Sequence, residues 1–193
     1  MHECAQLIRS GMATVRVAAA SQLDKAMSHA RKKAEEEGEM QVCEVANHLY
    51  CGVKVIGASE TCMRFLEENA NTYKFQFVKR LEVSGAFHTR QMEGAVEKLR
   101  EAMRQVELNP AVLNVYSNYT GQVHGAKKAE IRGALSKQVT SPVKWEQIQQ
   151  LLYRKHKDEV FPRFIECGPG RQLGAMLYAT SKKAHAHYEN VKV

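Results

Sequence analysis

The stretch VSGAFHTRQM (residues 83–92) separates two parts of the sequence that differ in their pattern of apolar residues. Upstream, short runs alternate apolar and polar residues, as half-buried strands do. Downstream, apolar residues recur at helical spacing, at Met92, Val96, Leu99 and Met103. His88 lies at this change, after the small residues SGA and before Thr89, which can cap a helix. The stretch therefore predicts a strand-to-helix junction that presents an imidazole.

Residues 11–82 show the element order β-α-β-β-α-β, which is the split βαβ, ferredoxin-like arrangement. The predicted strands are MATVRVAA (12–19), QVCEVA (41–46), VKVIGA (53–58) and YKFQFVKRL (73–81). Ser21 and Asp24 resemble a capping box that opens a first helix, and Ser59 can cap a second. We expect these residues to form one small subdomain.

Strands and helices also alternate beyond residue 83. The predicted strands are AVLNVYSN (111–118) and the first part of RFIECGPG (163–170), which runs into a glycine turn. Apolar spacing predicts helices within 92–103, 145–152 and 173–177. This alternation implies parallel strands joined by crossover helices. The chain as a whole is therefore predicted to have an α/β fold.

The composition of the 193-residue chain excludes several classes of protein. Its formal charge of +7 is spread along the sequence, which fits the handling of anionic metabolites better than nucleic-acid binding. Residues 73–81 carry aromatic side chains without the arrangement of an RNA-recognition motif. No apolar run approaches the ~20 residues of a membrane span. The five cysteines include no C-x-x-C pair, so we expect reduced thiols and neither a disulfide framework nor a zinc knuckle.

His88 is the candidate catalytic base, because the positive end of the following helix favours a neutral imidazole. The alternative is a histidine that only caps or packs. A nucleophile is not evident: the elbow motif G-x-S-x-G does not occur, Ser84 is interpreted as structural, and Cys43 and Cys167 have no activating neighbour. The residues alone thus indicate a base without a partner.

Two further motifs have residue types that could form binding sites. Gly168-Pro169-Gly170 could offer backbone amides to an anion, or could form only a tight turn. His185 and His187 have metal-ligand character, but no third ligand with suitable spacing appears, so they are interpreted as part of a polar tail. No metal site is predicted.

Four segments in this order resemble the malonyl-CoA:acyl carrier protein transacylases of the animal mitochondrial type. They are VSGAFHTRQMEGAVEKL, VYSNYTG, QVTSPVKWEQ and FIECGPGRQLGAML, and the upstream segments SGMATV and CEVANHLYCGVKVIGA resemble the small subdomain of that family. The resemblance covers nearly all 193 residues. It implies a fold with an α/β-hydrolase-like large subdomain, present here in part, and an inserted ferredoxin-like small subdomain. The divisions implied are 1–10 and 83–193 for the large subdomain and 11–82 for the small one.

The resemblance also implies a reaction. A serine would take malonyl from coenzyme A as an ester, and the phosphopantetheine thiol of acyl carrier protein would then accept it in fatty acid biosynthesis. His88 matches the catalytic histidine of the family, the backbone carbonyl of Gln138 matches the group that orients it, and Asn47 matches an asparagine near the cleft. Malonyl-CoA and acyl carrier protein are the implied partners, no cofactor is implied, and the implied location is the mitochondrial matrix, although no targeting segment is recognised in the sequence.

The sequence departs from the family in one large respect. The oxyanion loop, the elbow serine and the arginine that pairs with the malonyl carboxylate are missing, and Arg16, Arg80 and Arg90 do not stand in its place. We therefore expect a truncated product that is inactive alone, and that is poorly soluble or folds only within residues 11–82. The alternative is a non-catalytic module that binds acyl carrier protein through basic residues such as Lys127, Lys128 and Arg171.

Overall fold

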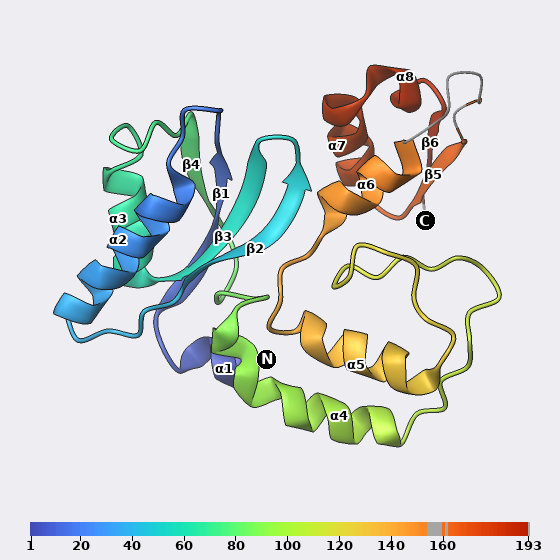
Figure 1. The fold of residues 1–193 in the computed structure, drawn as a ribbon, viewed down its shortest axis with the longest axis horizontal. Helices are drawn as coiled ribbons and strands as arrows, with labels where there is room; N and C mark the ends of the chain where they lie inside the picture. The colour runs from blue at the N-terminus through green and yellow to red at the C-terminus, as the bar shows by residue number, and fades with distance from the viewer. Residues whose placement is uncertain (154–159, 161, 193) are drawn as a thin grey trace.

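The computed structural model describes residues 1–153, 160 and 162–192. Figure 1 shows three groups of elements: a sheet flanked by two helices, a pair of long helices below it, and a C-terminal group of short helices and strands. The first group contains most of the buried apolar residues and holds the loop that carries His88.

The main sheet has four antiparallel strands in the order β2-β3-β1-β4. They are β1 (Ser10–Arg16), β2 (Cys43–Tyr50), β3 (Val53–Ser59) and β4 (Phe77–Leu81), and the helices α2 (Leu23–Glu36) and α3 (Glu60–Glu68) cover one face. Apolar residues from that face of the sheet, among them Val15 and Ile56, form one core with residues of the two helices, among them Ala30, Cys62 and Leu66. The element order along the chain is the one predicted for residues 11–82.

Three local predictions in this region need correction. Ser21 does not cap α2, whose N-cap is Gln22; instead its hydroxyl donates to the carbonyl of Lys74 at 2.5 Å and ties the two loops together. Ser59 is the N-cap residue of α3, yet its hydroxyl donates to the Val42 carbonyl at 3.5 Å rather than accepting from the helix. Tyr73 and Phe75 are buried as predicted, but they lie in the turn before β4 and not in the strand. Their rings fill the core beneath α2 and α3.

The second group joins the two ends of the sheet region. The short helix α1 (His2–Gln6) packs against the 3₁₀ helix η1 (Arg90–Ala95), which continues into α4 (Val96–Arg104). A buried cluster that includes Cys4, Ala5, Met92, Val96 and Val139 lies between them. Helix α5 (Lys128–Gln138), which the sequence did not predict, lies alongside α4 (Figure 1).

The third group contains α6 (Trp145–Tyr153), β5 (Phe164–Cys167), α7 (Gln172–Thr180), α8 (Lys182–His185) and β6 (Tyr188–Val191). β5 and β6 pair in parallel, as the alternating pattern predicted for this part of the chain. His185 lies in α8 and His187 precedes a strand, so the interpretation of these residues as a simple tail is wrong.

The predicted strand at residues 111–118 does not form. Only Tyr116 makes an isolated bridge, to Val123, and the Val112 and Leu113 side chains are 99% and 80% exposed. The reason is that a strand needs a neighbour for its backbone hydrogen bonds, and no strand of the described residues lies beside this segment. None of the described helices is long and apolar enough to cross a bilayer.

Candidate active site

The backbone at His88 is in the left-handed region, with φ of 60°. That conformation is uncommon for residues other than glycine and costs free energy unless the surroundings fix it. Thr89 fixes the following turn: its hydroxyl donates to the Ala86 carbonyl at 2.6 Å and accepts from the Gln91 amide at 3.3 Å. The cap predicted at Thr89 is therefore confirmed, although the helix that it opens starts as a 3₁₀ turn.

Two glycines let the His88 loop approach its neighbours closely. A Cβ at Gly57 on β3 would lie 2.7 Å from Thr89 Cγ2, and a Cβ at Gly85 would lie 2.7 Å from the Ala5 methyl of α1. The buried Gln91 side chain adds hydrogen bonds to the Ala86 amide at 3.2 Å and to the Cys4 carbonyl at 3.1 Å. The loop is thus clamped between the sheet and α1.

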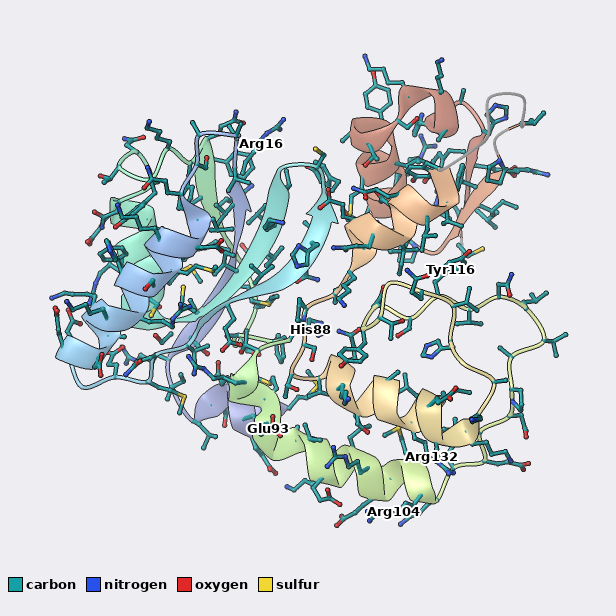
Figure 2. The ribbon with its side chains drawn as sticks, viewed as in Figure 1. Arg16, His88, Glu93, Arg104, Tyr116 and Arg132 are labelled. Atoms are coloured by element: carbon teal, nitrogen blue, oxygen red, sulfur yellow. The ribbon has the colours of Figure 1, made fainter. Side chains whose placement is uncertain are left out.

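The imidazole of His88 contacts the end of helix α5. Its Nδ1 lies 3.0 Å from the backbone carbonyl oxygen of Gln138, the last residue of α5. A carbonyl only accepts hydrogen bonds, so Nδ1 carries the hydrogen in this contact and a neutral ring leaves its lone pair on Nε2. Figure 2 shows His88 in the region between the sheet and α5. The arrangement is that of a base held in one tautomer.

The segment after α5 connects this contact to strand β2. The Gln138 side chain donates to the Ser141 carbonyl at 2.9 Å, and Val143 forms a parallel bridge with Asn47. Two backbone hydrogen bonds of 2.8 Å, from Val143 to Ala46 and from His48 to Val143, fix this register. The structure therefore brings His88 and Gln138 into contact and places Asn47 across the strand bridge, and no hydrogen bond among the described residues joins Asn47 to His88.

No hydrogen bond among the described residues joins the other candidate nucleophiles to the imidazole. Ser84 is exposed and faces a hollow lined by α1 and the start of β1. Cys43 is fully buried, and the neighbouring Cys62 thiol together with burial holds the pKa of Cys43 well above its ordinary value, so it is inert at neutral pH. Within the described part of the chain, no group of three or more His, Cys, Asp or Glu side chains could hold a metal ion.

The backbone amides that follow the glycine turn after β5 are already paired with a side chain of the protein. Gly168 and Gly170 have positive φ, and the amides of Leu173 and Gly174 in the first turn of α7 donate to the Glu166 carboxylate at 3.0 and 2.9 Å. Burial raises the pKa of Glu166, but hydrogen bonds from Tyr188 and these amides outweigh it and lower the pKa. Of the two interpretations of this turn, the tight turn is the one observed. Sequence reasoning missed Glu166, whose signal was a carboxylate within an apolar strand before a helix.

An apolar cavity of about 290 Å³ lies between α6, α7 and β5. Trp145, Phe164 and Leu177 are among its walls, and none of its described lining residues belongs to the His88 loop. This apolar cavity and the candidate base are therefore separate features of the molecule.

Comparison with known proteins identifies relatives of the chain. No family model matches the sequence. The mitochondrial malonyl-CoA-acyl carrier protein transacylase of Homo sapiens is 39% identical over 197 residues, which cover 100% of this chain and 50% of the human protein. The corresponding protein of Mus musculus is 36% identical over 194 residues, covering 100% of this chain and 51% of its own length. This chain is a relative of the malonyl-CoA-acyl carrier protein transacylases.

Solved structures show the same relationship for the fold of this transacylase relative. The crystal structure of malonyl CoA-acyl carrier protein transacylase from Clostridium perfringens superimposes with a TM-score of 0.82 at 23% identity, covering 99% of this chain and 56% of the bacterial one. The α/β fold is therefore shared with these enzymes. The chain spans about half the length of the curated relatives that it matches.

Proposed function

We propose that this chain carries the base-bearing half of a malonyl-CoA:acyl carrier protein transacylase. His88 is the general base that removes the proton of a serine nucleophile and returns it to the departing thiol of coenzyme A. The single observation that carries this proposal is the contact between His88 Nδ1 and the Gln138 carbonyl at 3.0 Å, which leaves Nε2 free to accept a proton.

The carbonyl of Gln138 acts in place of the carboxylate of a catalytic triad. Its oxygen lies at the C-terminal end of α5, where the helix dipole is negative and favours a ring that becomes positive during proton transfer. Asn47, on the strand that pairs with residue 143, is the proposed cleft residue. No catalytic step in this proposal needs a metal or a cofactor.

The nucleophile must come from another segment, because G-x-S-x-G does not occur in the sequence. A polypeptide corresponding to the remaining half of the relatives' length is the proposed source. In that assembly, residues 11–82 are the ferredoxin-like small subdomain, and residues 1–10 and 83–193 belong to an α/β-hydrolase-like large subdomain. The packing of α1 against η1 supports assigning residues 1–10 and the segment that follows residue 83 to one subdomain.

The substrates and location are proposed from the names of the relatives. Malonyl-CoA would donate, acyl carrier protein would accept, and the setting would be fatty acid biosynthesis in mitochondria. Lys127, Lys128 and Arg171 are exposed, so each is accessible to an acidic partner such as acyl carrier protein. The second candidate function is a module that binds acyl carrier protein without catalysis.

A reconstituted assay separates the two functions. This chain is combined with the remaining half of the human relative, and transfer of labelled malonyl to acyl carrier protein is measured. We expect His88→Ala to lower the transfer rate about 10²–10⁴-fold, as loss of a general base does, while His124→Ala, a matched change in a loop, leaves the rate unchanged. Undiminished transfer by His88→Ala would refute the role of His88. The chain alone, incubated with labelled malonyl-CoA, should form no ester.

A further inference from the structure

Four basic side chains lie on elements that also hold the proposed site: β2, β3, the end of α5 and the segment that follows it. We call His48, Lys54, Lys137 and Lys144 the basic cluster. Lys54 Nζ lies 3.0 Å from His48 Nδ1 on the neighbouring strand. Lys137 and Lys144 place their ammonium groups 5.7 and 5.8 Å from the centre of the Tyr119 ring. The cluster therefore joins the sheet, the end of α5 and the segment that follows it.

The cluster has no carboxylate partner among the described residues. In the described part of the chain, Lys54, Lys137 and Lys144 form no ion pair, whereas surface cations such as Lys98, Arg80 and Arg90 each contact a glutamate at 2.7–2.8 Å. Lys54, Lys144 and His48 are also partly buried, where repulsion between like charges is less screened. Such a grouping destabilises the free protein and is stabilised by a bound anion.

The state of His48 agrees with this excess of positive charge. Burial first, and then the charges of Lys54 and Lys144, lower the pKa of His48 below its ordinary value. The neutral ring accepts a hydrogen bond from Lys54, which fixes the ammonium group. The ring thus reports the local potential, and an anion bound nearby would raise its pKa.

The cluster is adjacent to the proposed catalytic groups along both connected segments. Lys137 precedes Gln138, whose carbonyl contacts His88, and His48 follows Asn47. Lys144 follows Val143, which bridges to Asn47. An anion held by the cluster would therefore lie at the edge of the site that contains His88.

We propose that the basic cluster binds the phosphate of a phosphopantetheine arm whose thiol end reaches toward His88. The inference rests on the proposed function, since the thioesters of that reaction are carried on such an arm. Three ammonium groups suit a phosphate, because lysine binds it as a point charge from several directions. The face of Tyr119 adds an apolar surface beside the two lysines for the uncharged part of the arm.

Titration of the 193-residue chain with 4′-phosphopantetheine, coenzyme A and pantetheine tests the site. The pKa of His48 is followed by NMR, and affinity is measured at two salt concentrations. We expect both phosphate-bearing ligands to raise the pKa of His48 and to bind at least about tenfold more tightly than pantetheine, with an advantage that shrinks in salt. A larger effect with coenzyme A than with 4′-phosphopantetheine would assign the site to the phosphates of the donor, and equal effects would assign it to the shared arm.

Variants identify the residues. Lys54→Met and Lys144→Met should each weaken binding of phosphopantetheine about tenfold, whereas Lys54→Arg should retain it. Lys25→Met, the same change at an exposed lysine of α2, is the control and should bind normally. Equal binding of pantetheine and phosphopantetheine, or a His48 pKa unchanged by saturating ligand in a chain with native NMR dispersion, would overturn the proposal. Because binding does not require transfer, a His88→Ala chain should bind normally, so failure of this site and failure of the proposed catalysis are distinguishable.

Discussion

The sheet region, residues 10–81, buries its apolar side chains much more completely than the C-terminal region, residues 105–192. In the sheet region two helices cover one face, and the core includes fully buried Ile56, Met63 and Leu66. The second face is partly covered by the His88 loop, through Phe87 against Met12 and Val55. The C-terminal region leaves large apolar side chains exposed, including Leu113, Ile165 and Leu173.

The physical difference lies in how each sheet satisfies its edges and faces. An antiparallel sheet built from neighbouring chain segments can bury one face and close locally. A parallel pair such as β5 and β6 needs more strands and cover on both faces, and two strands alone are rarely stable. The comparison therefore predicts that the sheet region folds firmly and that the C-terminal region depends on further partners.

Hydrogen exchange should show the largest contrast. Amides in the β1–β3 ladder are expected to exchange through global unfolding, whereas those of residues 112–115 exchange through local opening. The ladder amides should therefore exchange more slowly than those of residues 112–115, by about three orders of magnitude or more. Mass spectrometry of peptides after timed labelling measures both. Equal protection of the two segments would break the comparison.

Core substitutions should follow the same division. Leu66→Ala removes a fully buried side chain and should lower the free energy of unfolding by about 2–5 kcal/mol. Leu113→Ala is the matched change at an 80% exposed position and should alter it by less than about 0.5 kcal/mol. Denaturant titration followed by circular dichroism gives both values. A cost for Leu113→Ala that approaches that of Leu66→Ala would show a hidden core.

Gly57→Val tests how the sheet supports the candidate base. The new Cβ would lie 2.7 Å from Thr89 Cγ2 and 3.2 Å from Ala86 Cβ, so the loop must shift, at a cost of about 1–3 kcal/mol. We also expect the His88 ring resonances to move. Gly11→Val on β1, where nothing lies within 4 Å of the new Cβ, is the control. Unshifted His88 resonances in Gly57→Val would mean that the loop is held elsewhere.

Glu166 should give the smallest effect, which is present at neutral pH and disappears in acid. Its folded pKa is lowered from the ordinary 4.5, so its carboxylate contributes stability above that value and loses it as pH falls through the folded pKa. Glu166→Gln should remove this pH dependence at a cost on the order of 1 kcal/mol or less at neutral pH. Thermal unfolding at pH 7 and pH 3 measures it. If the wild-type chain and Glu166→Gln lose the same amount of stability between pH 7 and pH 3, the Glu166 carboxylate makes no such contribution.

Prediction from sequence succeeded where local pattern and local structure coincide. The order of elements through residue 82, the Thr89 cap and the helix of residues 145–153 follow from periodicity and capping chemistry. It failed at residues 111–118 because strand formation depends on a neighbour, not on apolar alternation alone. It also missed α5, in which Gly133 and few apolar residues give a weak helical pattern.

The residue types near VSGAFHTRQM, together with the resemblance of the downstream motifs, were enough to single out His88, Gln138 and Asn47. The tertiary structure shows that the Gln138 carbonyl, 50 residues away in sequence, meets His88 Nδ1, as the resemblance implied. Only the tertiary structure decided that Val143 pairs with the strand of Asn47. The same folding gathers His48, Lys54, Lys137 and Lys144, which no local pattern connects. Periodicity encodes which face of an element is buried, whereas contacts between distant segments depend on how those faces pack.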